Sequence, residues 1–364
     1  MVSGARTVGG ARLEVGIIGC GRIAEQAHAP AWADNADLAS VTALADPDLG
    51  RLSVVGSLLG VPPHRRYRDS LTMLAQHRFD LVDAAVPHSF HRPVIEAIAG
   101  AGAHVLSEKP LATTTADVDA ILRRVADCGV QLGVIHNYLH LDTTLAADRW
   151  RREGRIGKPF LYRNECVRHG HYVGARGFDP DWRTKPEVSG GGCLLDEGYH
   201  SLYLAEHLLD SPIASIYAQT ATYRQRIDVE DSAFVLCRHR SGATTSLTVS
   251  WAVPAGGSGA NEVHGTGGTI SFTHPSATAA VTSDGDDSWD TVDEPYVLHR
   301  SFARAFREAL KSLLDEGRFI VDGRAAKRNL ALVAAAYRSG ATGQAVSIGD
   351  DVPGVAAPPA ADAP

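Results

Sequence analysis

Short apolar runs alternate with longer amphipathic stretches over the first 135 residues. The apolar runs cover 13–19, 38–45, 81–86, 104–107 and 131–135, and clear helical periodicity lies at 93–101 and 116–128. Strands that alternate with helices in this way are typical of βαβ units, whose parallel strands are buried on both faces. This part of the chain therefore predicts an α/β fold with a doubly wound parallel sheet.

A different pattern begins after residue 135. Longer segments at 213–223, 232–239 and 244–251 alternate apolar with polar residues, with only turns between them. Such alternation indicates mostly antiparallel strands with one covered face. Helical periodicity returns at 302–314 and 330–337. We expect a flexible tail at 1–12, an α/β domain at 13–136, an α+β domain at 137–350 and a second flexible tail at 351–364.

Composition excludes several classes of protein. The chain has 364 residues, 44% of them hydrophobic and 21% charged, which suits a globular protein of two domains. No apolar run approaches the roughly 20 residues that span a membrane. The formal net charge of −7, without a Lys/Arg cluster, argues against nucleic acid or an anionic membrane as a partner.

The cysteines favour a reducing compartment. There are five of them, an odd number, and none forms a C-x-x-C pair, so neither a disulfide framework nor a zinc site is indicated. His169 and His171, near Cys166, are too closely spaced for the usual metal-binding motifs. We expect a cytoplasmic protein without a bound metal.

A glycine-rich turn follows the first predicted strand directly. It reads G-x-G-x-x-A, with Gly19 for the tight turn, Gly21 for close approach of a pyrophosphate and Ala24 for helix packing, and Arg22 and Ile23 lie between them. Asp46 ends the next strand, where a carboxylate can bind the adenosine ribose hydroxyls. That carboxylate would repel a 2′-phosphate, so NAD is favoured over NADP, although the nearby Arg51 keeps NADP open.

Two later segments carry candidate chemistry. Ser107-Glu108-Lys109-Pro110 places a lysine at the carboxyl edge of the parallel sheet, where such folds bind ligands. In a later helical stretch, Asp196 and His200 are four residues apart, which would set them side by side on one face. A carboxylate beside an imidazole suits a general acid/base group. On spacing alone, the pair is also typical of an exposed helix face, and the sequence leaves open whether Pro87 or Pro110 follows a cis bond.

Taken together, these motifs resemble the family of glucose–fructose oxidoreductase, inositol dehydrogenase and rhizopine-catabolism (Gfo/Idh/MocA) oxidoreductases. The resemblance covers nearly the whole chain in the expected order. It rests on G-x-G-x-x-A at 19–24, Asp46, P-x-x-x-H at 87–91, E-K-P at 108–110, G-G-G-x-x-x-D-x-G-x-H at 190–200 and G-T-x-G-T-I at 265–270.

The resemblance implies an N-terminal Rossmann domain for NAD and a second domain with a large, mostly antiparallel open sheet for substrate binding and oligomerisation. Lys109, Asp196 and His200 match the family's catalytic positions. His200 would take the hydroxyl proton, Lys109 would hydrogen-bond the reacting oxygen, and Asp196 would hold His200 or a substrate hydroxyl. A homodimer or homotetramer that pairs through the open sheet is expected.

Further site residues are expected around this group. His88 stands where the family usually has asparagine, and the usual basic residue is missing near Asn137, so substrate identity does not transfer. The remaining cofactor candidates are Pro87, His88, His91 and Glu108, in addition to Lys109, and the substrate candidates are Asn137, Tyr138, Asn164, Trp182 and Arg183.

The sequence therefore predicts an NAD-dependent dehydrogenase that interconverts a secondary alcohol and a ketone on a sugar, cyclitol or related polyol. Two alternatives remain. One is an NAD-dependent glycosidase that uses transient oxidation, and the other is a non-catalytic regulator that senses NAD or sugar. Retention of Lys109, Asp196 and His200 argues against the regulator.

Overall fold

The first sheet is built from the N-terminal third of the chain. The computed structural model describes residues 12–175, 178–274, 278–285, 289–293 and 295–349, so the expected tails lie outside it except for Arg12. Within these residues, six parallel strands pair in the order β3-β2-β1-β4-β5-β6. They are β1 (Leu13–Ile18), β2 (Ala39–Ala45), β3 (Arg66–Tyr67), β4 (Leu81–Ala84), β5 (His104–Ser107) and β6 (Leu132–Val134). The doubly wound sheet predicted from the sequence is confirmed, while the two-residue β3 is too short to leave a pattern.

Helices connect these strands. They are α1 (Ala29–Asp34), α2 (Leu49–Leu58), α3 (Ser70–Gln76), α4 (His91–Gly100) and α5 (Thr115–Asp127). The Thr114 side chain accepts a hydrogen bond from the backbone N–H of Asp117 and caps α5. Gly129, at φ 68°, follows the end of that helix in the left-handed conformation that glycine favours.

The second sheet is larger and mixed. Among the described residues it has nine strands in the order β14-β13-β12-β11-β7-β10-β9-β8-β15, all antiparallel except the β7–β10 pair. The strands are β7 (Pro159–Val167), β8 (Ile213–Ala221), β9 (Ser232–His239), β10 (Thr244–Ser250), β11 (Ala260–Gly265), β12 (Gly268–Thr273), β13 (Thr278–Ser283), β14 (Asp290–Asp293) and β15 (Val346–Ser347).

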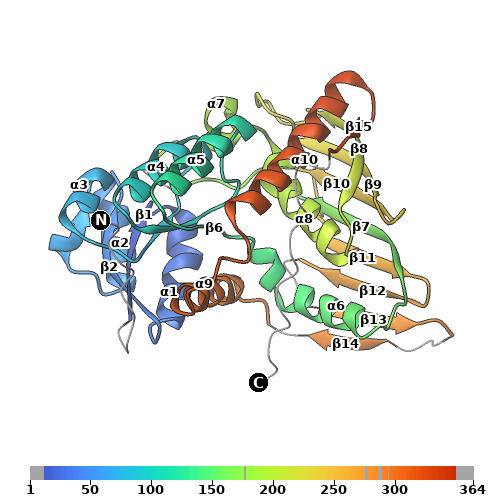
Figure 1. Cartoon of the computed structure of the whole chain (residues 1–364). Coiled ribbons are helices and arrows are strands. Elements are labelled where there is room, and N and C mark those ends of the chain that lie inside the picture. Colours follow the sequence, from blue (N-terminus) through green and yellow to red (C-terminus); the bar gives the residue numbers. More distant parts are fainter. Residues whose placement is uncertain (1–11, 176–177, 275–277, 286–288, 294, 350–364) are drawn as a thin grey trace.

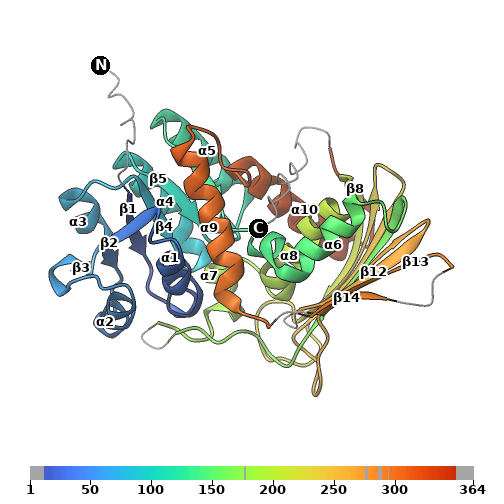
Figure 2. The ribbon, with the colours of Figure 1, turned by 90° about the horizontal axis from the view of Figure 1, so that it is seen from below.

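One face of this sheet is covered by helices α6 (Asp142–Arg152), α8 (Tyr199–Leu208) and α10 (Gly323–Thr342), which lie between it and the first domain (Figures 1 and 2). The other face is open in both views. Strand β9 shows the consequence, because its residues alternate between buried and exposed, with Phe234, Leu236 and Arg238 outward. The predicted antiparallel sheet with a single covered face is confirmed.

Helix α9 (Leu298–Leu314) packs back on the first domain. It lies against α1 and the turn before it, and its buried Phe302, Phe306 and Leu310 belong to the same apolar cluster as Trp32. Figure 2 shows α9 crossing the first domain next to α1. A helix from the second half of the chain thus completes the apolar core of the first domain.

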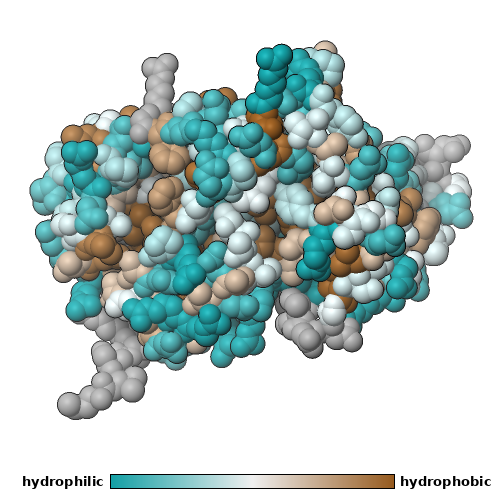
Figure 3. Space-filling model, turned by 90° about the horizontal axis from the view of Figure 1, so that it is seen from above, coloured by the Kyte–Doolittle hydropathy of each residue, from teal (hydrophilic) through white to brown (hydrophobic). Residues whose placement is uncertain are grey.

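The surface is mixed in polarity. Viewed from above, hydrophobic residues lie scattered among hydrophilic ones (Figure 3). None of the helices in the described part of the chain is long and apolar enough to cross a membrane.

We expect Leu310→Ala to destabilise the protein by about 2–5 kcal/mol, because it removes a fully buried side chain between α9 and the first domain. Chemical unfolding measures the change. Leu58→Ala is the matched control, because Leu58 is 55% exposed and its loss should cost less than about 0.5 kcal/mol. Equal effects of the two changes would show that α9 does not stabilise the first domain.

Candidate active site

The glycine-rich turn has the geometry that a dinucleotide needs. Gly19 adopts φ 97°, and a Cβ there would overlap the backbone carbonyl of Ala85, so only glycine fits. Gly21 is different, because a Cβ there would meet only the guanidinium of Arg51, at 4.0 Å. Its missing side chain therefore leaves open space beside the backbone, which is what close approach of a pyrophosphate requires. The residues present fit a dinucleotide.

The chain leaves this turn through a π-helical turn at Ala24–His28 rather than a regular α-helix. Ala24 is fully buried, and Ile23 precedes it and packs against the core. The guanidinium of Arg22 donates to the carbonyl oxygen of Val173, 3.1 Å away, in a loop of the second domain. The turn is thus linked to the loop that precedes the glycine triplet.

Asp46 lies at the end of β2, directly beside this turn. Its carboxylate accepts hydrogen bonds from the backbone N–H groups of Cys20 and Asp48, both at 2.8 Å, and Arg51 lies 3.5 Å away. These bonds hold the carboxylate at the carboxyl end of β2, where an adenosine ribose would lie.

A buried histidine connects the turn to the E-K-P segment. Nδ1 of His28 lies 2.8 Å from a carboxylate oxygen of Asp83, and Nε2 lies 2.9 Å from one of Glu108. Trp32 also donates to Asp83. Burial opposes the charged form, but Asp83 and Glu108 overcome it and raise the pKa of His28 to about 10. His28 is therefore an imidazolium that holds two carboxylates.

Glu108 also holds the backbone of the next residue, Lys109. Its second oxygen accepts a hydrogen bond from the backbone N–H of Lys109 at 3.0 Å. The peptide bond between Lys109 and Pro110 is cis. His28 and Asp83 were not predicted from the sequence, although a polar residue inside the apolar run of β4 indicates that a buried partner exists.

Two more histidines follow β4. Pro87 begins the turn, and His91 is fully buried, with its ring nitrogens 2.7 Å from the carbonyl oxygen of Pro110 and 2.8 Å from that of Val86. Nδ1 of His88 lies 2.8 Å from the carbonyl oxygen of Ser189, so His88 contacts the second domain. Burial lowers the pKa of both histidines.

Lys109 meets Asp196 across the domain boundary. Its ammonium group donates to the backbone carbonyl of Asp196 at 2.7 Å and to its carboxylate at 3.0 Å. Arg183 donates to the other carboxylate oxygen at 3.1 Å, and its guanidinium lies over the ring of Trp182, 4.2 Å from the centroid. Burial opposes the charge, yet the two cations hold the pKa of Asp196 well below its usual range.

The glycine triplet at 190–192 leads into the segment that carries Asp196, and it packs too closely for side chains. A Cβ at Gly190 would clash with Thr113, one at Gly191 with the Tyr337 hydroxyl, and one at Gly192 with the Glu230 carbonyl. Beyond the triplet, Leu194–Gly198 forms a second π-helical turn before α8 begins. A π-helical turn contains more residues than an α-helical turn, so different side chains lie on the same face of the helix.

His200 and Asp196 consequently have different partners. The spacing predicted that Asp196 would lie beside His200, but Asp196 binds Lys109 and Arg183, while Nδ1 of His200 lies 2.7 Å from the hydroxyl of Tyr203. The His200 ring stacks on Tyr138, with centroids 4.0 Å apart. Burial and the charge of Lys109 lower the pKa of His200 well below its usual value.

The remaining substrate candidates divide into two groups. Tyr138, Trp182 and Arg183 lie beside the group of Lys109, Asp196 and His200 through the contacts above. Asn137 is buried and donates to Ser301 at 3.4 Å. Asn164 lies on β7, where it donates to Asn261 at 2.8 Å and accepts from Ser201 at 2.7 Å. Its hydrogen bonds go to the sheet and α8, so the structure gives it a packing contact rather than one with the group around Lys109.

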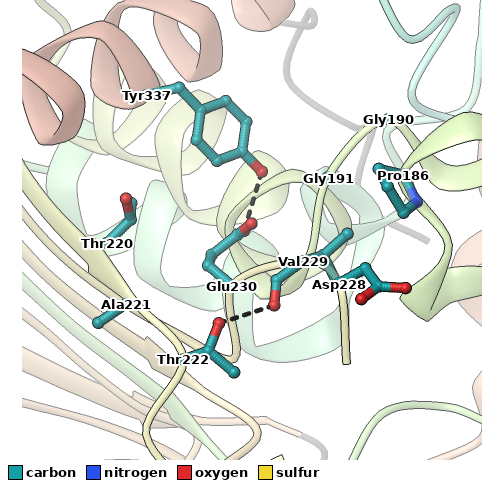
Figure 4. A pocket seen from close by; sticks show the side chains of 10 residues that line it. All are labelled: Pro186, Gly190, Gly191, Thr220, Ala221, Thr222, Asp228, Val229, Glu230 and Tyr337. Atoms are coloured by element: carbon teal, nitrogen blue, oxygen red, sulfur yellow. Dashed lines mark hydrogen bonds between the residues drawn. The ribbon is translucent and has the colours of Figure 1, made fainter. Parts of the chain in front are cut away.

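An open pocket lies behind the glycine triplet, and none of the expected catalytic residues lines it (Figure 4). The hydroxyl of Tyr337 points at Glu230 and donates to it at 2.8 Å. The same carboxylate accepts from the backbone N–H groups of Gly192 and Leu194, each at 3.0 Å. Glu230 therefore holds the start of the segment that carries Asp196. The described residues contain no cluster of three His, Cys, Asp or Glu side chains that could hold a metal ion.

Comparison with known proteins agrees with this geometry. Residues 13–136 match the oxidoreductase family with an NAD-binding Rossmann fold, and residues 144–271 match the GFO/IDH/MocA C-terminal domain. The chain belongs to the Gfo/Idh/MocA family of oxidoreductases, which confirms the resemblance seen in the sequence and the enzyme class expected from it.

Similar proteins extend over almost the whole chain. D-apiose dehydrogenase of Rhizobium rhizogenes is 29% identical over 358 residues, which span 93% of this chain and 98% of the relative. 1,5-Anhydro-D-fructose reductase of Ensifer adhaerens is 28% identical over 74% of this chain and 80% of its own length. An oxidoreductase from Agrobacterium radiobacter, solved with NAD+, L-tartaric acid and magnesium, is 27% identical with a TM-score of 0.79, and the match covers 93% and 98% of the two chains.

The buried charge of His28 makes stability depend on pH. Because its folded pKa of about 10 exceeds the unfolded value near 6.5, its contribution is complete below about pH 6.5 and is lost as the pH rises through 10. Between these values the free energy of unfolding should fall by up to about 1.4 kcal/mol per pH unit. His28→Gln should flatten this slope in urea unfolding, whereas exposed His64→Gln should keep it. A wild-type slope in the His28 variant would contradict a charged His28.

Proposed function

We propose that this chain is an NAD-dependent dehydrogenase that transfers hydride between nicotinamide C4 and a secondary alcohol or ketone carbon of a sugar, cyclitol or related polyol. The observation that carries the proposal is the contact between Lys109, from the cofactor domain, and Asp196, from the other domain, beside His200. Lys109, Asp196 and His200 act as the acid/base group. The names of the relatives, which are dehydrogenases and reductases of sugars, support a polyol substrate.

Different cofactor residues bind different parts of NAD. Gly19, Gly21 and Ala24 shape the turn for the pyrophosphate, with Arg22 and Ile23 beside it. Asp46 binds the adenosine ribose, and Pro87, His88, His91, Glu108 and Lys109 lie at the nicotinamide end. Bound NAD supplies the chemistry of hydride acceptance and donation at C4 of its nicotinamide. NAD is preferred to NADP because the carboxyl group of Asp46, held by two backbone N–H groups, can accept hydrogen bonds from ribose hydroxyls but would repel a 2′-phosphate.

The acid/base group is already arranged before the substrate arrives. An ammonium group has three N–H donors, and two of those of Lys109 face Asp196. The third is available to the reacting oxygen, whose developing negative charge it stabilises. Arg183 and Trp182 close one side of the substrate site, and Tyr138 and Asn137 lie on the other.

The protein assembles as a homodimer or homotetramer in the cytoplasm. The open face of the second sheet supports this assembly, because Tyr217, Phe234 and Leu236 are 48%, 42% and 51% exposed there. Their strands pair directly, with Tyr217 opposite Leu236, so the apolar side chains form one patch that a second copy can cover.

A screen for NADH formation with inositols, aminocyclitols, aldoses and glycosides tests the function. We expect NADH with at least one neutral polyol, and we expect Lys109→Ala to lower kcat on it by about 100-fold or more while the Kd for NAD changes only a few-fold. Near-normal kcat in the variant would remove Lys109 from the mechanism. Release of free sugar from a glycoside without NADH would establish the glycosidase instead, and NAD binding without any turnover would favour a regulator.

Asp46→Ala should weaken NAD binding more than NADP binding, because only the unphosphorylated ribose hydrogen-bonds to the carboxylate. Titration of both cofactors measures the two Kd values. Asp48→Ala is the matched control, since Asp48 caps α2 through the backbone N–H of Arg51 without reaching the expected ribose position. The assignment of Asp46 fails if the ratio of the two Kd values is the same in wild type and in Asp46→Ala.

A further inference from the structure

The hydroxyl group of Tyr203 lies between two nitrogen atoms in a buried position. The backbone N–H of Tyr138 donates to its oxygen at 3.2 Å, and Nδ1 of His200 lies 2.7 Å from the same oxygen. Tyr203 is 1% exposed, and its ring stacks on His136 with centroids 4.1 Å apart. The hydroxyl is therefore held in place, and water does not reach it.

Hydrogen-bond accounting distinguishes the two neutral forms of His200. A phenol has one proton to donate and can accept two bonds. If Nδ1 of His200 carried the proton and donated it, the phenolic proton would have no acceptor among the described residues, and a buried unpaired donor is costly. If the Tyr203 hydroxyl donates to Nδ1 instead, the phenolic proton, Nδ1 and the backbone N–H of Tyr138 are all paired, and Nε2–H is left to donate to a substrate. The proton of the neutral imidazole is then on Nε2.

We propose that Tyr203 is a positioning residue that holds neutral His200 in the tautomer with the proton on Nε2. His200 then donates a hydrogen bond to the reacting oxygen and does not take its proton. The identity of the reacting oxygen rests on the proposed function, whereas the tautomer rests on the geometry of Tyr203 alone.

The surroundings of His200 keep it neutral. The groups that face it are Lys109 after β5, Asp196 and Tyr199 on its own segment, His136 and Tyr138 after β6, and His274 after β12. Burial lowers the pKa of His136 to about 3 and that of His274 to about 4, so neither contributes a positive charge at neutral pH. Asp196 favours a charged His200, but its carboxylate is already bound by Lys109 and Arg183.

The proton of the reaction then moves between the substrate and Lys109. With NAD bound as the hydride acceptor, oxidation would start from the form of Lys109 that has given up a proton, and its amine would take the hydroxyl proton as the substrate carbon gives up its hydride and becomes C=O. In reduction, the ammonium of Lys109 returns that proton to the oxygen as the carbon accepts the hydride. His200 gains and loses no proton in either direction and stabilises the oxygen through Nε2–H.

Substitution of His200 separates a donor from a base. In His200→Gln the amide NH2 replaces the Nε2–H donor, so kcat should stay within about 10-fold of wild type. His200→Leu has no donor, and its kcat should fall by about 100-fold or more. Thermal unfolding confirms that both variants are folded. Equal, severe losses in two folded variants would show that His200 acts as a base and would overturn the proposal.

Nitrogen-15 NMR of the full chain labelled at histidine reads the tautomer directly, with His200→Gln used to assign the signals. Wild type should show Nε2–H for His200. Tyr203→Phe removes the donor to Nδ1, so a fraction with Nδ1–H should appear and kcat should fall by about 10-fold, with the KM for NAD unchanged. Tyr199→Phe, which removes a buried hydroxyl on the same helix that contacts His136 instead, should keep the wild-type signal. Nδ1–H in the wild type would overturn the proposal.

The spectroscopic experiment needs no substrate, so its result is independent of the proposed function. An Nε2–H signal in a protein that oxidises no polyol would refute the proposed function and leave the tautomer standing. Polyol oxidation by a protein with an Nδ1–H signal would support the proposed function and refute the proposed tautomer.

Discussion

The ion pair between Lys109 and Asp196 is the contact on which the active site depends. Two charges removed from water are stable only when each is paired and hydrogen-bonded. Here the ammonium group comes from the end of β5, and the carboxylate comes from the segment before α8, so the pair forms only where the two domains meet, although Arg183 of the second domain also binds the carboxylate. The two domains must therefore be packed together before the charges of the site are stable, and α9 and α10 provide that packing.

Both members of the pair are held by buried groups away from the substrate. On the cofactor side, His28 binds Glu108, and Glu108 accepts the backbone N–H of Lys109. On the other side, Glu230 accepts the backbone N–H groups at the start of the segment that carries Asp196. His28 also ends the π-helical turn that begins beside the glycine-rich loop, so the cofactor turn and the lysine are parts of one hydrogen-bonded unit.

Sequence patterns predicted the fold well because the strongest signals are local. The strand at 104–107 and the cap of α5 by Thr114 follow from apolar runs and short-range hydrogen bonding. Gly19 was recognised because a tight turn demands glycine, and Gly190 was recognised as part of a family motif. The π-helical turn at Leu194–Gly198 was different, because α-helical spacing predicted that Asp196 would bind His200, whereas Asp196 binds Lys109 and Arg183 and its charge acts on His200 from nearby.

The partners of buried polar groups were harder to predict, because they come from distant parts of the chain. Nothing near His28 in the sequence points to Asp83 or Glu108. The motif that identified His200 likewise gave no role to Tyr203, although the two are only three residues apart. A motif records which residues recur, whereas the proton on an imidazole is decided by the donor and acceptor count of its neighbours.

The neighbours of each buried group also explain how charge is distributed in the site. Burial removes the charge from His88, His136, His200 and His274, while Lys109 and Arg183 hold the pKa of Asp196 well below its usual range despite the same burial. A site with several imidazoles thus has its permanent charges on a single cluster. When the reacting oxygen becomes negative, the nearest group that can both stabilise that charge and release a proton belongs to this cluster. The neutral imidazole beside it can only orient the oxygen, which makes its tautomer matter more than its basicity.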